Sequence, residues 1–186
     1  MKTKQLQETT DFLVSKGFKK PTIGIVLGTG LHQLIHEIDI EQEIAYKDIP
    51  HFPKATVEFH SGKLVYGTLS GKKVVVMSGR FHLYEGYNHW EVTYGIRAMH
   101  QLGITSLLIS NASGAINLSY KKGELMLIDD HLNLQGNSPL AFAEVGEFGE
   151  RFADMLAPYS KKMNDFLKSI ANENDIQLHE GVYAGV

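Results

Sequence analysis

The stretch that decides the fold has the sequence KVVVMSGRFHLYEGY and spans residues 73–87. After one lysine, residues 74–77 form a short apolar run, which predicts a buried β-strand. Arg80, His82 and Tyr84 follow just past the expected carboxyl end of that strand. Open α/β sheets bind their ligands at this edge. The stretch therefore predicts both a central strand and a candidate binding turn.

The side chains of this turn suit an anionic ligand that carries a ring. Arg80 presents a planar fork of N–H donors, which matches an oxyanion such as phosphate. His82 can be neutral or charged near neutral pH, and Tyr84 adds a flat face and a hydroxyl. Gly79 and Gly86 flank the turn and permit backbone angles that other residues rarely adopt. A surface turn with charged rim residues would have the same composition, so the turn alone leaves both interpretations open.

Two other apolar runs also end in small residues. Residues 21–27 predict a buried strand that ends at Gly28-Thr29-Gly30, and residues 104–109 predict another that ends at Ser110-Asn111-Ala112-Ser113-Gly114. Residues 31–35 have apolar side chains at helical spacing, so a helix is expected to start after the first loop, where its amides would favour an anion. Three such strand ends make a better case for a binding site than any one of them.

The glycine loop at residues 28–30 lacks the motifs of common nucleotide sites. A dinucleotide fingerprint needs a third glycine, but position 33 is Gln33. A Walker-type loop needs Gly-x4-Gly-Lys-Ser/Thr, and the nearest approach, residues 67–72, has the wrong spacing. The sequence therefore gives no support for a standard nicotinamide or ATP site. On this loop alone, a plain tight turn around Thr29 is the favoured interpretation.

The rest of the chain is expected to supply helices, a hairpin and further strands. The predicted helices cover residues 3–16, 89–103 and 158–172, and the last has an apolar stripe that is expected to be core: Met163, Phe166, Leu167 and Ile170. The predicted strands cover residues 63–69 and 72–77, which Ser70-Gly71 joins as a hairpin, and residues 124–128 and 177–186. A long polar loop is predicted for residues 40–62, and a structural turn for Asp129-Asp130-His131.

Composition narrows the class of protein. The 186 residues are 43% hydrophobic and 21% charged, which is ordinary for one globular domain. A net charge of -3 gives no case for nucleic acid or a membrane held by bulk charge. The absence of cysteine, of a secretion signal and of a long apolar run favours a cytoplasmic location. His32 and His36 have helical metal spacing but no third ligand, so no metal is assigned.

Several of these motifs occur together, in an order that closely resembles the trimeric purine nucleoside phosphorylases. They are residues 28–31, 78–87 and 110–114, with Asp130-His131-Leu132-Asn133-Leu134 and Glu180-Gly181-Val182-Tyr183. The resemblance runs from about residue 20 to the last residue. It implies an α/β fold with a central twisted mixed β-sheet surrounded by helices. It also implies a homotrimer that splits inosine- and guanosine-type nucleosides with inorganic phosphate as co-substrate, giving free base and pentose 1-phosphate, with no cofactor.

The resemblance further implies roles for individual residues. Those expected to face phosphate are Thr29, His60, Arg80, His82 and the backbone N–H of Ala112. Of these, Arg80 and His82 are expected to be catalytic. The residues expected at the ribose are Tyr84 and, from a neighbouring subunit, Phe152. The residues expected to shape the loops are Gly28, Gly30 and Asn111.

Members of that family continue past the strand at Tyr183 with residues that grip the purine, whereas this chain ends at Val186. The expectation is a single domain over residues 1–186 that lacks its C-terminal part, with most of a phosphate site and little of a base site. Methylthioadenosine phosphorylase is an alternative within the same fold. A catalytically impaired, phosphate-binding chain is the alternative from another class, and a generic sugar-phosphate or nucleotide binder is a third.

Overall fold

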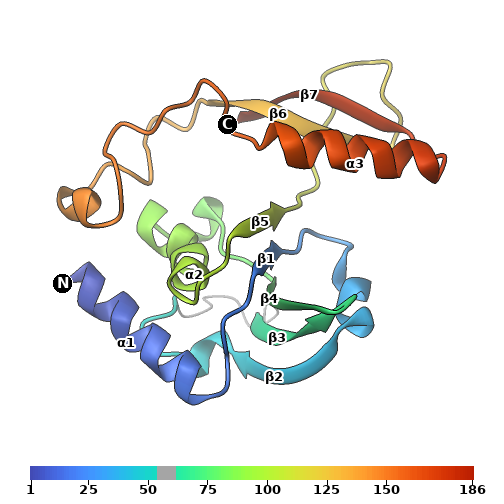
Figure 1. The fold of residues 1–186 in the computed structure, drawn as a ribbon. Coiled ribbons are helices and arrows are strands. Elements are labelled where there is room, and N and C mark those ends of the chain that lie inside the picture. The colour runs from blue at the N-terminus through green and yellow to red at the C-terminus, as the bar shows by residue number, and fades with distance from the viewer. Residues whose placement is uncertain (54–61) are drawn as a thin grey trace. The chain divides into compact units, whose positions relative to one another are not determined.

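The computed structural model describes residues 1–53 and 62–186, which divide into two compact units, Met1–Ser113 and Gly114–Val186 (Figure 1). We call them the N-terminal unit and the C-terminal unit. The helices and strands of the N-terminal unit are α1 (Lys2–Ser15), β1 (Ile23–Val26), β2 (Asp39–Ala45), β3 (Lys63–Leu69), β4 (Lys72–Ser78), α2 (His89–Gln101) and β5 (Ser106–Ile109). Short 3-10 helices span His32–Glu37, Tyr46–Asp48 and Leu83–Glu85. The prediction of one domain over the whole chain stays a prediction.

The strands of the N-terminal unit form a mixed sheet. Among the described residues its order is β2-β3-β4-β1-β5. β1 pairs in parallel with both β4 and β5, whereas β3 pairs antiparallel with β2 and β4. Parallel neighbours place their carboxyl ends at one edge, so β4, β1 and β5 all end at the same edge of the sheet. The predicted α/β class with a mixed sheet and helices is confirmed.

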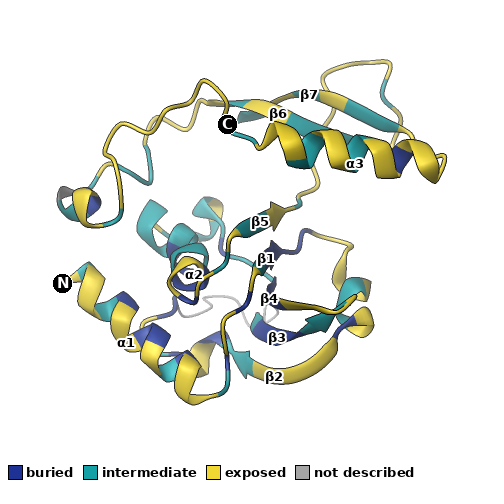
Figure 2. Cartoon of the chain, viewed as in Figure 1, coloured by how far each residue is buried: buried dark blue, intermediate teal, exposed yellow. Residues whose placement is uncertain are grey.

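The core lies in the central strands of this sheet. Figure 2 shows dark blue, buried residues in β1, β3 and β4, and Val74, Val75 and Val76 are at most 1% exposed. The apolar run in the sequence therefore marks a strand that is covered on both faces, as predicted. From the helices, the buried residues are Leu6, Thr9, Thr10 and Leu13 of α1 and Tyr94, Gly95, Ala98 and Met99 of α2.

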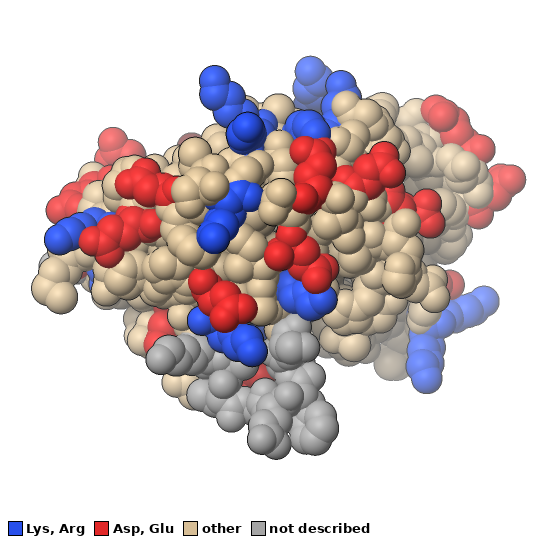
Figure 3. Space-filling view, turned by 90° about the horizontal axis from the view of Figure 1, so that it is seen from below, with Lys and Arg blue, Asp and Glu red and all other residues tan. Residues whose placement is uncertain are grey.

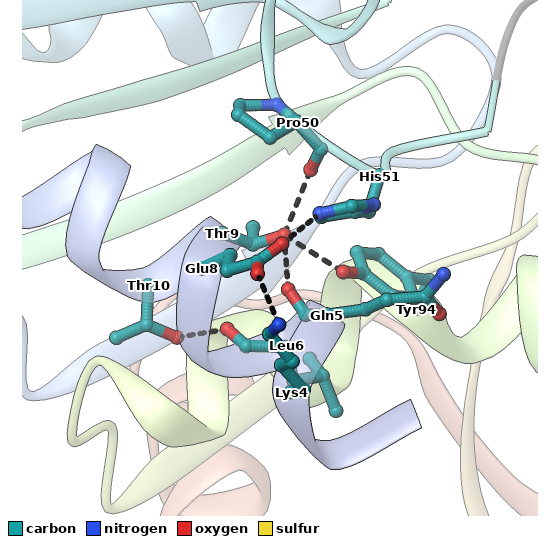
Figure 4. Close-up of polar contacts among 9 residues, drawn as sticks. All are labelled: Lys4, Gln5, Leu6, Glu8, Thr9, Thr10, Pro50, His51 and Tyr94. Atoms are coloured by element: carbon teal, nitrogen blue, oxygen red, sulfur yellow. Dashed lines mark hydrogen bonds and ion pairs between the residues drawn. The ribbon is translucent and has the colours of Figure 1, made fainter. Parts of the chain in front are cut away.

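A buried polar network joins α1 to the rest of the N-terminal unit (Figure 4). The hydroxyl oxygen of Thr9 lies 2.7 Å from both the Pro50 carbonyl oxygen and the Tyr94 hydroxyl. Nearby, His51 Nε2 lies 2.6 Å from Glu8 Oε2. A buried hydroxyl is tolerated when it has such partners, which explains how α1 can bury Thr9 together with Leu6 and Leu13.

The hairpin between β3 and β4 forms as predicted. Ser70 and Gly71 have φ of 47° and 74°, the left-handed angles that a type I′ turn requires. This turn matches the twist of the two strands, which pair from Lys63 with Ser78 to Leu69 with Lys72. The hairpin delivers the Gly79–Tyr87 segment to the edge of the sheet where β4 ends.

The long loop predicted for residues 40–62 is wrong over its first part. β2 occupies Asp39–Ala45, and the 3-10 helix Tyr46–Asp48 follows it. Among the residues that the structure describes, β2 is an edge strand that pairs only with β3, and its side chains up to Glu43 are exposed. An exposed edge strand does not need the apolar alternation by which strands are recognised, so this segment had the composition of a loop.

Two predictions at the ends of strands are also corrected. The helix expected after Leu31 is a six-residue 3-10 helix, His32–Glu37, which is too short for the expected contribution from a helix dipole. β5 was expected to be buried, but Leu108 and Ile109 are 37% and 54% exposed. The reason is position, because β5 is an edge strand that pairs only with β1 in the described sheet.

The C-terminal unit contains β6 (Leu125–Asn133), α3 (Lys161–Glu173) and β7 (Leu178–Gly185). β6 and β7 pair in parallel, and the backbone register shifts between Ile128 and Asp130. The turn predicted at Asp129-Asp130-His131 is therefore wrong, because these residues lie within β6. The bulge at this position interrupts the alternation that marks a strand.

The apolar stripe of α3 is only partly core. Phe166 and Ile170 are 66% and 37% exposed, whereas Ala171 on the same helix is buried. The helix begins after Ser160, whose hydroxyl accepts a hydrogen bond from the Met163 N–H. The amphipathic period thus predicted the helix correctly, but a pair of strands covers less of its apolar face than a full sheet would.

Charges on the surface are mixed in sign. On the face drawn in Figure 3, blue Lys and Arg side chains are interspersed with red Asp and Glu side chains. This mixture agrees with the small net charge of -3. Within the described residues, every helix is too short or too polar to cross a bilayer.

The contact between Glu124 and His179 links the residue just before β6 to β7. Glu124 Oε2 lies 2.7 Å from His179 Nε2 and accepts a hydrogen bond from the Lys121 N–H. The Lys121 hydrogen bond and, after it, His179 lower the pKa of Glu124 below its ordinary value. A carboxyl group whose pKa is lower in the folded state stabilises the fold at pH values above its unfolded-state pKa, which is about 4.3. This stabilisation is lost as the pH falls through the folded-state pKa.

We therefore expect Glu124→Gln to lower the melting temperature at pH 7, with a difference that shrinks as the pH falls below about 4. Thermal unfolding followed by circular dichroism at pH 7 and pH 3.5 would measure it. Glu150→Gln is the control, because Glu150 is an exposed glutamate of the same unit. A melting difference that is equal at both pH values would contradict the prediction.

Candidate functional site

Three turns leave the sheet side by side. Val26 of β1 pairs with Met77 of β4 and with Ile109 of β5, so the three parallel strands end level with one another. The segments that follow are residues 28–30, 79–82 and 110–112. The sequence predicted each of these strand ends separately, and the sheet brings them together at one edge.

Ser110 connects all three turns. Its hydroxyl oxygen accepts a hydrogen bond from the Gly28 N–H at 2.9 Å, and it lies 3.3 Å from the Val26 carbonyl oxygen. Its own carbonyl oxygen accepts a hydrogen bond from Arg80 Nη1 at 2.8 Å. The guanidinium of Arg80 is therefore held against the loop that follows β5. The sequence places Ser110 in a motif but indicates no role for it.

The contact between the first and third turns requires a glycine at position 28. A Cβ on Gly28 would lie 2.7 Å from the Ser110 carbonyl oxygen and 2.9 Å from the Asn111 Cα. Both neighbours are backbone atoms, which cannot swing aside as a flexible side chain can. Position 30 favours glycine for a different reason. The φ of Gly30 is +87°, and residues that carry a Cβ rarely adopt such an angle.

The first and second of these turns border a pocket of about 530 Å³. Of the residues predicted for the site, those that line it are Gly28, Thr29, Arg80, His82 and Tyr84. Other ionisable residues in the lining are His32, His36, Glu43, Lys63 and Glu85. Lys63 is paired with Glu43 at 2.6 Å. The fixed guanidinium of Arg80 and the hydroxyl of Thr29 therefore give this pocket groups that can hold an oxyanion.

The turn after Arg80 places two rings together. The rings of His82 and Tyr84 are stacked, with centroids 4.7 Å apart and an angle of 18° between their planes. The backbone N–H of His82 donates to Glu85 Oε2 at 2.9 Å, and the short helix Leu83–Glu85 ends at Gly86 with a φ of 93°. Tyr84 remains 83% exposed, so its ring is open to a ligand.

Tyr46 lines the pocket, although no sequence pattern predicted it as a site residue. Its side chain is 4% exposed, and its hydroxyl donates a hydrogen bond to the Gly79 carbonyl oxygen at 2.7 Å. Burial raises the pKa of Tyr46 well above its ordinary value, so this hydroxyl stays protonated. The sequence contains one indication that Tyr46 is unusual, namely that it is an aromatic residue within a polar stretch.

Other predicted residues are absent from the pocket lining or lie outside the described residues. Asn111 and Ala112 are exposed and do not line the pocket, and Asn111 Nδ2 donates to the Ala112 carbonyl oxygen at 3.3 Å. Phe152 lies in the C-terminal unit and is 90% exposed. His60 lies outside the described residues. The role of each residue of the predicted site stays a prediction.

Comparison with known proteins identifies the family. The family model of the phosphorylase superfamily matches residues 22–186. Purine nucleoside phosphorylase 1 of Geobacillus stearothermophilus is 45% identical over 178 residues, which are 96% of this chain and 65% of that protein. Purine nucleoside phosphorylase 1 of Bacillus subtilis (strain 168) is 41% identical over 182 residues, which are 98% of this chain and 67% of that protein.

A solved structure is also similar to this chain. Isoform 2 of purine nucleoside phosphorylase from Schistosoma mansoni, in complex with cytosine and ribose-1-phosphate, superposes with a TM-score of 0.93 at 41% identity. The superposition covers 98% of this chain and 66% of that one. The chain belongs to the phosphorylase superfamily and, within it, to the purine nucleoside phosphorylases. It spans about 65% of the length of the Geobacillus relative.

Proposed function

We propose that the protein is a purine-nucleoside phosphorylase, which splits inosine- and guanosine-type nucleosides into free purine base and (deoxy)ribose 1-phosphate in purine salvage. The observation that carries this proposal is the Arg80 guanidinium, fixed 2.8 Å from the Ser110 carbonyl oxygen in a pocket that Thr29 also lines. A rigid cation beside a hydroxyl, at the edge where three strands end, suits a bound phosphate.

The chemistry requires a held nucleophile and stabilised charge. When an N-glycosidic bond breaks, positive charge develops on the sugar and negative charge on the leaving base. Arg80, His82 and Thr29, which line the pocket, would hold phosphate beneath the anomeric carbon, and the Ala112 N–H would reach it from the turn after β5. A phosphate oxygen attacks the anomeric carbon as the bond to the base breaks. The negative charge of phosphate then stabilises the sugar cation. Paired carboxylates are not needed, because phosphate itself is the nucleophile.

The exposed ring of Tyr84, stacked on His82, supports a place for the ribose beside the phosphate. Phe152 is proposed to enter the ribose pocket of a neighbouring copy, because its side chain is exposed and available to a partner. A homotrimer is therefore part of the proposal. So are a cytoplasmic location and a reaction with purine nucleoside and phosphate but no cofactor.

Release of hypoxanthine from inosine tests this function directly. We expect release only when phosphate is present, with formation of an equal amount of ribose 1-phosphate. Release of adenine from methylthioadenosine, with inosine left intact, would favour methylthioadenosine phosphorylase instead. Retention of phosphate binding in calorimetry, with no turnover of either nucleoside, would favour a catalytically impaired phosphate-binding chain.

A further inference from the structure

Tyr46 contacts the arginine turn on both sides of Arg80. Its hydroxyl donates to the Gly79 carbonyl oxygen at 2.7 Å, and its ring packs against the Phe81 ring with centroids 5.2 Å apart. On its other side, the Tyr46 ring packs against Phe52 at 5.3 Å. These contacts fix the residues immediately before and after Arg80. The guanidinium itself is held at its far end by Ser110.

Tyr46 also holds a second segment against the same turn. Its backbone N–H donates to the Gly62 carbonyl oxygen at 3.0 Å, and a Cβ added to Gly62 would collide with its ring. Gly62 in turn lies close to Gly79, since a Cβ on Gly79 would be 3.3 Å from the Gly62 Cα. The left-handed Gly79, with a φ of 94°, is thus enclosed between Gly62 and the Tyr46 hydroxyl.

We propose that Tyr46 is a positioning residue, which sets the backbone of residues 79–81 so that the Arg80 guanidinium faces the phosphate pocket. It acts through Arg80 and transfers no proton. This inference rests on the proposed function and adds a residue to its machinery. An arginine fork recognises an oxyanion through the directions of its N–H bonds, so a small backbone shift reduces its affinity for phosphate.

Tyr46→Phe tests the proposal because it removes one hydroxyl and keeps the ring. We expect the phosphate Kd and the phosphate KM to rise about five- to tenfold, as the loss of one buried hydrogen bond predicts. The KM for the nucleoside should change less than twofold. Isothermal titration with inorganic phosphate and steady-state kinetics on the full chain would measure these quantities.

Tyr66→Phe is the matched control. Tyr66 is 2% exposed, and its hydroxyl donates to a backbone carbonyl oxygen, that of Lys19, at the same distance of 2.7 Å. Tyr66 is absent from the pocket lining. Both variants should therefore lose similar thermal stability, but only Tyr46→Phe should weaken phosphate binding. Equal phosphate affinities in the two variants would overturn the proposal.

Two further measurements separate this inference from the proposed function. In an Arg80→Ala background, Tyr46→Phe should cause no further loss of phosphate affinity, and a full additive loss would contradict action through Arg80. The NMR signal of the Arg80 Nε–H should shift in Tyr46→Phe but not in Tyr66→Phe. This measurement is made on the free protein and needs neither phosphate nor turnover. An unshifted signal would refute the positioning role even if the protein is no phosphorylase.

Discussion

Arg80→Ala is expected to reduce kcat/KM for phosphorolysis about a hundredfold or more while leaving the fold intact. The Arg80 guanidinium lines the pocket, and a hydrogen bond to the Ser110 carbonyl oxygen fixes its position. Its removal takes away charge and preorganised donors together, and losing one such donor typically costs about a hundredfold or more in rate. Phosphate-dependent release of hypoxanthine from inosine would measure the loss.

Two further variants test whether the loss of activity is specific to the Arg80 guanidinium. Arg80→Lys keeps the charge but loses the planar fork, so its activity should fall between those of the wild type and Arg80→Ala. Lys72→Ala removes a positive charge from the exposed start of β4 and should have wild-type activity. Far-ultraviolet circular dichroism should be alike for all variants. Full phosphorolysis by Arg80→Ala would refute the assignment of the site.

Gly28→Ala is expected to disrupt both the fold and the pocket. The new Cβ would lie 2.7 Å from the Ser110 carbonyl oxygen, so the first and third turns would have to move apart. Overpacking of this kind costs about 1–3 kcal/mol. It would also strain the hydrogen bond from the Gly28 N–H to the Ser110 hydroxyl, and Ser110 in turn holds Arg80. Phosphate affinity should therefore fall together with stability.

Urea denaturation and phosphate titration of the same samples would measure both effects of Gly28→Ala. Gly146→Ala is the control, because a Cβ there meets no atom within 4 Å and its φ is not left-handed. That variant should match the wild type in stability and in phosphate affinity. A Gly28→Ala protein with unchanged stability would show that the two turns can separate at little cost.

Local patterns predicted most of the fold correctly. The apolar runs before residues 28, 78 and 110 marked the three parallel strands. In β1 and β4 the run reflects burial, because strands buried on both faces need apolar side chains at nearly every position, whereas β5 is partly exposed. Ser70-Gly71 marked the hairpin because it accepts left-handed angles. β2 was missed because an exposed edge strand carries no such constraint. The bulge in β6 likewise concealed a strand within a polar run.

The candidate site was predicted only in part. Arg80, His82, Thr29 and Tyr84 were proposed from their place after strands and from resemblance, and the structure puts all of them around one pocket. The sequence did not predict the contacts that Ser110 and Tyr46 make around this pocket. Serine after a strand and tyrosine in a polar stretch are common, and what distinguishes these two residues is their hydrogen bonds to distant segments.

The sequence by itself determined most of the elements, the kinds of group available to an anion and the family of the protein. Those properties follow from short-range periodicity, turn chemistry and motif order along the chain. Only the tertiary structure decided that Val26, Met77 and Ile109 lie level and that Ser110 ties three turns together. Such register and contacts depend on packing between residues up to 84 positions apart, for which a single sequence carries no local signal.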